Sequence, residues 1–76
     1  MEERLSCSVE LHQEDIDGKT VFVADCIELG ISDFGDNVNE AISNLRKGIN
    51  LLLEEMPQKK ELLREQRPVM ITRLLL

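Results

Sequence analysis

Tryptophan and tyrosine are absent from this 76-residue chain, and Phe22 and Phe34 are its only aromatic residues. Aliphatic side chains must therefore form most of the core. A chain of this length allows one domain, which buries only about 60% of its unfolded surface and has a marginal core. We therefore expect self-association to enlarge the buried surface, as a homodimer or a higher homo-oligomer.

Cysteine and histidine are also scarce, with two cysteines and one histidine. These three residues cannot complete a four-ligand structural zinc site within one chain. Charged residues open the chain and no apolar run follows them, so we expect no signal peptide. The longest apolar runs, residues 51–53 and 74–76, are far shorter than a membrane span. Together these absences predict a cytoplasmic protein with reduced cysteines and no membrane partner.

Acidic residues are concentrated in the first half of the chain. Ten acidic and two basic residues give residues 1–36 a net charge of −8, while five acidic and seven basic residues give residues 37–76 a charge of +2. An acidic half disfavours binding to a phosphate backbone, so we expect no direct contact with nucleic acid. It suits a basic partner, although acidity that serves only solubility gives the same pattern.

The clearest periodic pattern lies between Gly35 and Met56. Apolar residues recur there at spacings of three and four, which places them on one stripe of a helix. Asn37 is suited to cap the first turn, with Glu40 three residues later, and Pro57 lacks the N–H needed to continue the helix. The pattern predicts one long helix whose apolar stripe needs a surface to cover. The stripe comprises Val38, Ala41, Ile42, Leu45, Ile49, Leu52, Leu53 and Met56.

Two alternating segments before this helix predict a β-hairpin. Residues 5–12 alternate apolar and polar side chains, and residues 20–27 form a second strand pattern. Asp17-Gly18, between them, is a strong signal for a two-residue turn.

With that turn, each strand residue is assigned to one of two faces. Cys26 lies opposite Val9 and Ala24 lies opposite Leu11, so one face is apolar and suits the helix stripe. The other face mixes polar side chains of the first strand with β-branched side chains of the second. Those β-branched residues either reflect strand propensity alone or mark a face that a partner covers. Facing the helix are Cys7, Val9, Leu11, Phe22, Ala24 and Cys26, and on the other face lie Ser6, Ser8, Glu10, His12, Val21, Val23 and Ile27.

The remaining segments predict a turn at residues 28–30, a third strand at 31–34, a short helix at 58–66 and a strand at 69–76. We therefore predict an α+β fold with the order β-β-β-α-(short α)-β in a single domain. An antiparallel three-stranded meander with one long helix packed on one face forms residues 1–56. A short helix and a C-terminal edge strand form residues 57–76.

The C-terminal strand ends in apolar side chains that need a cover in water. Either the strand joins the sheet of its own chain or it pairs with another chain, and the sequence leaves both open. The predicted oligomer-interface residues are Met70, Thr72, Leu74 and Leu76.

No set of residues predicts catalysis. A cysteine with His12 is the only candidate pair of nucleophile and base, and the register places His12 on the face opposite both cysteines. Four acids near the third strand follow no ligand spacing, and solvated carboxylates or a docking surface are expected there instead of a metal site. We therefore expect no enzyme activity, no cofactor and no metal. The four acids are Asp25, Glu28, Asp33 and Asp36.

One stretch of the chain resembles a known family. Residues 22–37 read Phe-Val-Ala-Asp-Cys-Ile-Glu-Leu-Gly-Ile-Ser-Asp-Phe-Gly-Asp-Asn, followed by Glu-Ala at 40–41 and Leu-Arg-Lys-Gly-Ile at 45–49. The stretch resembles HicB-like antitoxins, whose signature is aromatic-Val-Ala-x-Cys-Pro-Glu-Leu-Pro-Gly, then Gly-Asp-Thr and an amphipathic helix. This chain has Ile27 in place of the first proline and lacks the second. It has Asn37 in place of threonine, which keeps the capping chemistry.

The resemblance covers residues 5–55 and implies a partial ribonuclease-H-like fold without the catalytic acids of ribonuclease H. It implies a non-catalytic antitoxin that binds a small basic HicA-like toxin, which cleaves messenger RNA, and blocks its active site. Many family members add a C-terminal DNA-binding domain. About twenty residues follow Pro57, so we expect no added domain here.

An acidic sheet would attract a basic toxin, which agrees with the distribution of charge. The alternative is a stand-alone oligomeric structural or regulatory protein of the same fold, without a toxin partner. In either case the helix stripe is used by the core, so we expect binding on the opposite face of the sheet. The predicted partner-binding residues are Glu10, His12, Val21, Val23, Asp25, Ile27 and Glu28.

Overall fold

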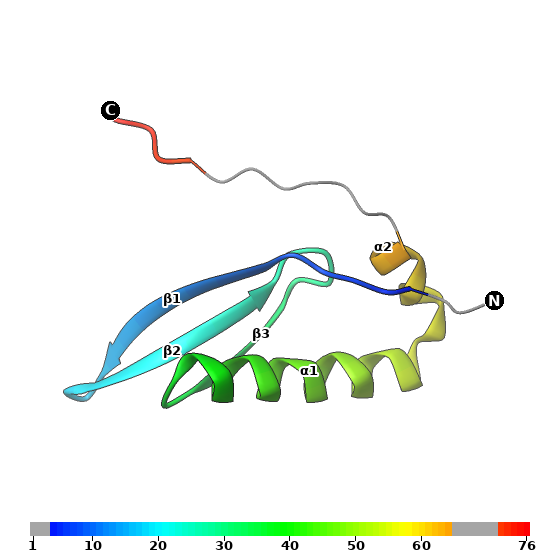
Figure 1. Cartoon of the computed structure of the whole chain (residues 1–76), viewed down its shortest axis with the longest axis horizontal. Helices are drawn as coiled ribbons and strands as arrows, with labels where there is room; N and C mark the ends of the chain where they lie inside the picture. The colour runs from blue at the N-terminus through cyan, green and yellow to red at the C-terminus, as the bar shows by residue number, and fades with distance from the viewer. Residues whose placement is uncertain (1–3, 65–71) are drawn as a thin grey trace.

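An antiparallel sheet of three strands, with one long helix across one of its faces, forms the body of the molecule (Figure 1). The computed structural model describes residues 4–64 and 72–76. The predicted α+β class is confirmed, as is the order of three strands, a long helix and a short helix. The elements are β1 (Val9–Ile16), β2 (Lys19–Cys26), β3 (Ile31–Gly35), α1 (Val38–Glu55), the 3-10 helix η1 (Pro57–Lys60) and α2 (Glu61–Arg64).

The turn between β1 and β2 is centred on Asp17 and Gly18. Their φ angles are 51° and 80°, and a two-residue turn with both φ angles positive matches the right-handed twist of the paired strands. Val9 pairs with Cys26 in the resulting ladder, which confirms the predicted register and therefore the assignment of side chains to faces.

The bounds of the first strand differ from the prediction. β1 ends at Ile16 instead of residue 12, because a two-residue turn lets backbone pairing continue to the turn itself. The polar side chains of residues 13–15 are exposed on this projecting end of the hairpin. Residues 5–8 are not part of a strand, although the Ser8 carbonyl accepts a hydrogen bond from the Ile27 N–H at 3.0 Å.

Local chemistry sets both ends of α1, as predicted. The Asn37 side chain accepts a hydrogen bond from the Glu40 N–H at 2.8 Å, which satisfies one of the free donors of the first turn. At the other end the Met56 N–H donates to the Leu52 carbonyl at 2.8 Å, and Pro57 follows.

The core lies between α1 and the sheet. α1 packs against β3 and β2, and the buried centre consists of Ala24 and Cys26 from β2 with Ala41 and Leu45 from α1. Gly35 sets how closely the two layers approach, because a Cβ atom at this position would lie 2.6 Å from the Ala41 nitrogen.

After α1 the chain turns back towards the N-terminal run. The predicted helix at 58–66 is instead a 3-10 turn followed by the four-residue α2, and residues 65–66 lie outside the described residues. Leu63 is buried, and its carbonyl accepts a hydrogen bond from the Ser6 N–H at 3.0 Å. That bond holds α2 beside the segment that leads into β1.

The predicted C-terminal edge strand does not belong to the described sheet. Residues 69–71, including Met70, lie outside the described residues, while Thr72–Leu76 have no regular secondary structure and are exposed. Leu74, Leu75 and Leu76 are 80–112% exposed. Within the described parts of the chain, no helix has the length and apolarity to cross a bilayer.

Candidate binding face of the sheet

One face of the sheet is turned away from α1, and we call it the open face. Residues that pair across antiparallel strands point to the same face, and successive residues alternate. Because Ala24 and Cys26 face α1, the residues of β2 that alternate with them face away from it. The open face carries Glu10, His12 and Glu14 from β1, Val21, Val23 and Asp25 from β2, and Ser32 and Phe34 from β3.

The apolar part of the open face is centred on Phe34, which is 60% exposed although it is one of the two aromatic residues of the chain. It pairs directly with Val23, which is half-buried. Ile27 follows β2 and is 42% exposed. An exposed aromatic side chain beside β-branched residues is typical of a surface that contacts another molecule.

Two observations bear on the residues predicted to bind a partner. Val21 is only 6% exposed, so it is buried within its own chain and offers little surface to a partner. Phe34 was missing from the predicted binding residues, because the face of β3 depends on the turn at 28–30. A register that pairs Ile31 with Cys26 would have identified Phe34 from the alternation of side chains alone.

The polar part of the open face is built around His12. This position agrees with the prediction that His12 lies on the face opposite both cysteines. Its Nδ1 lies 3.1 Å from Asp25 Oδ2, and its Nε2 lies 3.2 Å from Glu14 Oε1. The second oxygen of Asp25, Oδ1, accepts a hydrogen bond from the Ser32 hydroxyl. Glu10 pairs with Asp25 across the two strands and is exposed.

The acids that were grouped around β3 in sequence have separate partners in the structure. The Glu28 carboxylate accepts the Ser8 N–H with both oxygens, at 2.8 and 3.0 Å, and so holds the segment that leads into β1. Asp36 forms an ion pair with Lys19 at 2.9 Å, and this contact raises the pKa of the Lys19 ammonium group. Asp33 accepts from the Phe34 N–H.

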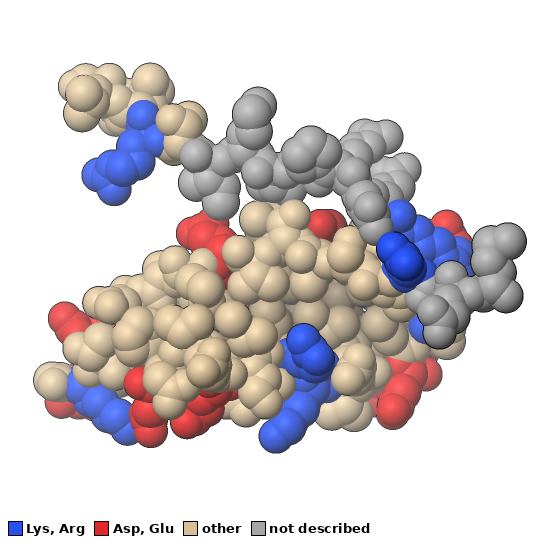
Figure 2. Space-filling view, viewed as in Figure 1, with Lys and Arg blue, Asp and Glu red and all other residues tan. Residues whose placement is uncertain are grey.

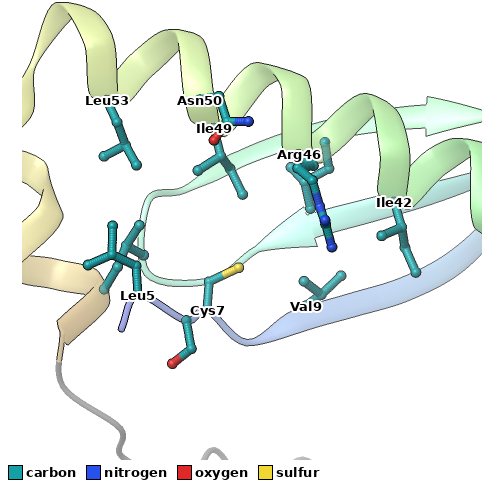
Figure 3. Close-up of a pocket in the computed structure, with 11 residues that line it drawn as sticks. Leu5, Cys7, Val9, Ile42, Arg46, Ile49, Asn50 and Leu53 are labelled. Carbon is teal, nitrogen blue, oxygen red and sulfur yellow. The ribbon is translucent and has the colours of Figure 1, made fainter. Parts of the chain in front are cut away.

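The helix side of the sheet carries a groove next to β1. α1 covers β2 and β3, which leaves Val9 and Leu11 of β1 36% and 43% exposed. A groove of about 540 Å³ lies between α1 and the run into β1. Figure 3 shows Ile42 and Ile49 of α1 on one side of the groove, and Cys7 and Val9 on the other. The groove is mainly apolar, with an arginine and an asparagine of α1 in its lining.

Cys7 also lines this groove, and its chemistry is that of a weak nucleophile. Burial, and then the neighbouring Cys26 and Glu28, raise the pKa of the Cys7 thiol to about 11. A thiol acts as a nucleophile in its thiolate form, and at neutral pH this one stays protonated. Both cysteines are free.

Charge is distributed unevenly over the surface. In the view of Figure 2, the middle of the molecule is mostly uncharged and acidic side chains gather at the end that carries the turn between β1 and β2. That end includes Glu14, Asp15 and Asp17, all exposed. The hairpin is therefore the part of the molecule best suited to attract a basic partner.

The geometry defines a small α+β domain in which a helix covers one face of the sheet, and no helix within residues 4–64 covers the other. Comparisons of this chain with protein-family models, with curated proteins and with solved structures found no match.

Proposed function

We propose that this protein is a HicB-like antitoxin, a non-catalytic binding module that neutralises a small basic HicA-like toxin. The proposal rests on the resemblance of residues 5–55 to that family. The observation that supports a particular binding surface is the open face, where the exposed Phe34 ring lies beside the acidic hairpin. Such a surface combines an apolar anchor with charge complementary to a basic ribonuclease.

Phe34 is the proposed anchor for the toxin. It is 60% exposed on the open face, and Leu51 is equally exposed on α1, which covers the opposite face. Truncating a buried aromatic anchor at an interface typically costs at least about 2 kcal/mol of binding energy, or roughly thirtyfold in affinity. Phe34→Ala should therefore abolish neutralisation, whereas Leu51→Ala should leave it unchanged.

The test is a search for a small basic open reading frame beside the gene, followed by its co-expression with this chain. That neighbour alone should arrest growth, and wild-type chain and Leu51→Ala should restore growth while Phe34→Ala does not. Circular dichroism of both variants checks that they are folded. Loss of neutralisation by Leu51→Ala with retention by Phe34→Ala would place the toxin on the other side of the molecule. The absence of any toxic neighbour would contradict the antitoxin role.

We also propose that the chain self-associates, in cytoplasm and without a membrane or nucleic-acid partner. The support is the exposed leucine run at residues 74–76 together with the apolar groove beside β1. If no toxin exists, a stand-alone oligomeric structural or regulatory role is the alternative function. Light scattering should show a dimer or larger species for the full chain and a smaller species for Leu74→Ser/Leu76→Ser. A monomeric wild-type chain would contradict self-association.

A further inference from the structure

The imidazole of His12 has different partners at its two nitrogens. A carboxylate can only accept a hydrogen bond, so Nε2 must donate to Glu14 Oε1, which lies 3.2 Å away. Nδ1 is buried and makes no hydrogen bond within the described structure, although Asp25 Oδ2 lies only 3.1 Å from it. The Nδ1 and Oδ2 atoms are thus close but not aligned for an N–H···O bond.

This arrangement leaves an acceptor nitrogen close to an acceptor oxygen. A neutral imidazole that donates from Nε2 carries its free lone pair on Nδ1, and Asp25 Oδ2 lies to one side of the direction of that lone pair. Two acceptors at this distance repel each other unless a positive charge lies close to both. Either a second proton on His12 or a metal ion can supply that charge.

Glu10 adds a second carboxylate to the same place. It is directly opposite Asp25 in the β1–β2 ladder, and like charges directly opposite in a sheet repel. One ligand atom from each of Glu10, His12 and Asp25 can be chosen so that all lie within 4.8 Å of one another. Among the described residues, no other set of three or more His, Cys, Asp or Glu side chains meets this condition.

We propose that Glu10, His12 and Asp25 bind a divalent transition-metal ion on the open face, with Zn²⁺ as the representative ion. With metal–ligand bonds of about 2.1 Å, the His12 Nδ1 and Asp25 Oδ2 atoms at 3.1 Å subtend about 95° at the ion. That angle lies between octahedral and tetrahedral geometry. Glu10 is exposed, so its side chain has room to turn towards the ion.

The groups around these ligands are already arranged as they are in metal sites. A metal-binding histidine usually donates its other N–H to a carboxylate, and a ligating carboxylate is itself hydrogen-bonded. Glu14 accepts from Nε2 of His12, and the Ser32 hydroxyl donates to Oδ1 of Asp25, which leaves Oδ2 free. Glu14 is therefore a positioning residue that selects the tautomer with Nδ1 available.

The donor set also indicates the class of ion. One imidazole and two carboxylates suit zinc and its first-row neighbours, whereas magnesium and calcium prefer oxygen ligands alone. Three protein ligands leave at least one coordination position open, as in catalytic-type zinc sites. The three ligands lie on the open face, which no helix of the described residues covers.

The test uses the full chain without an added tag and relies on His12 being its only histidine. Zn²⁺ titration followed by ¹⁵N NMR of the imidazole should show one saturable site, with the Nδ1 resonance shifted and Nε2 still protonated. Calorimetry should give one Zn²⁺ per chain, with affinity lowered at least tenfold by His12→Gln and by Asp25→Asn. Glu14→Gln should lower affinity about tenfold, as loss of an orienting partner does. A large excess of Mg²⁺ should not compete.

Two matched variants exclude other sites for the metal. Glu55→Gln removes one exposed carboxylate from the end of α1, and Cys7→Ser removes a thiol, and both should bind Zn²⁺ as the wild-type chain does. The proposal is overturned if the wild-type chain shows no saturable site, or if His12→Gln and Asp25→Asn bind equally well. It is also overturned if both imidazole nitrogens are protonated at neutral pH and Zn²⁺ leaves them unchanged, since His12 is then an imidazolium in an ion pair. All these measurements use the isolated chain, so their outcome is independent of any toxin.

Discussion

Replacing Gly35 with alanine tests how closely α1 lies against the sheet. A Cβ at this position would lie 2.6 Å from the Ala41 nitrogen and 2.8 Å from the Glu40 Cβ. The nearest atom is backbone in the first turn of α1, so a side-chain rotation cannot relieve the contact and the helix itself must move. Overpacking of this kind costs about 1–3 kcal/mol, and we expect the upper part of that range. In a domain of this size, about 2–3 kcal/mol corresponds to a fall in Tm of roughly 10–20 °C.

Gly48→Ala is the matched control, because the same substitution should have the opposite effect there. A Cβ at position 48 meets no atom within 4 Å, and Gly48 lies inside α1. Alanine is favoured over glycine in a helix interior by about 0.8–1 kcal/mol, so Tm should rise by roughly 4–8 °C. Thermal and urea unfolding, followed by far-ultraviolet circular dichroism, measure both variants. A Gly35→Ala variant as stable as the wild-type chain would refute the close approach of α1 to β3.

Three further predictions concern the helix cap, the core and a thiol. Asn37→Ala should lower the free energy of unfolding by about 1 kcal/mol through loss of the cap, while Asn39→Ala should not lower it, and equal losses in urea unfolding would contradict the cap assignment. Leu45→Ala should cost about 2–5 kcal/mol, because this side chain is 2% exposed, whereas Leu51→Ala should cost less than about 0.5 kcal/mol. A similar cost for both would mean that the buried side of α1 is misassigned. Burial raises the pKa of the Cys7 thiol from 9.0 to about 11. The unfolded chain therefore loses this proton first, and the contribution of Cys7 to stability should decline as pH rises from 9.0 to about 11. Cys7→Ser should lack that decline, and fast reaction with a thiol reagent at pH 8 would contradict the raised pKa.

Much of the fold follows from short-range chemistry that can be read along the chain. Asp17-Gly18 specifies a turn with two positive φ angles, and that turn alone sets the register of β1 and β2. Asn37 and Pro57 mark the start and the end of the long helix within one residue. The period of the apolar residues then identifies the stripe that faces the sheet. These features were predictable because each depends on residues only a few positions apart.

The candidate site was predictable only in part. Alternation placed His12 and Asp25 on the same face, away from the cysteines, and the structure agrees. It did not predict that Glu28 is held by Ser8, or that Val21 is buried within its own chain. The acids near β3 were grouped by their closeness in sequence. Strands bring together residues that are distant in sequence, so the acids that meet on the open face are a different set from the acids that are neighbours in the sequence.

The sequence by itself determined the local elements of this protein, its acidic hairpin and the two faces of its first two strands. A turn type, a capping side chain and a hydrophobic period act over a few residues, so no tertiary contact is needed to read them. Only the tertiary structure decided that Phe34 joins the open face and that His12 Nδ1 faces Asp25 Oδ2 without a hydrogen bond. Those relations depend on the pairing of three strands and on side-chain rotamers within them. Such features are settled by packing across the sheet and not by any pattern along the chain.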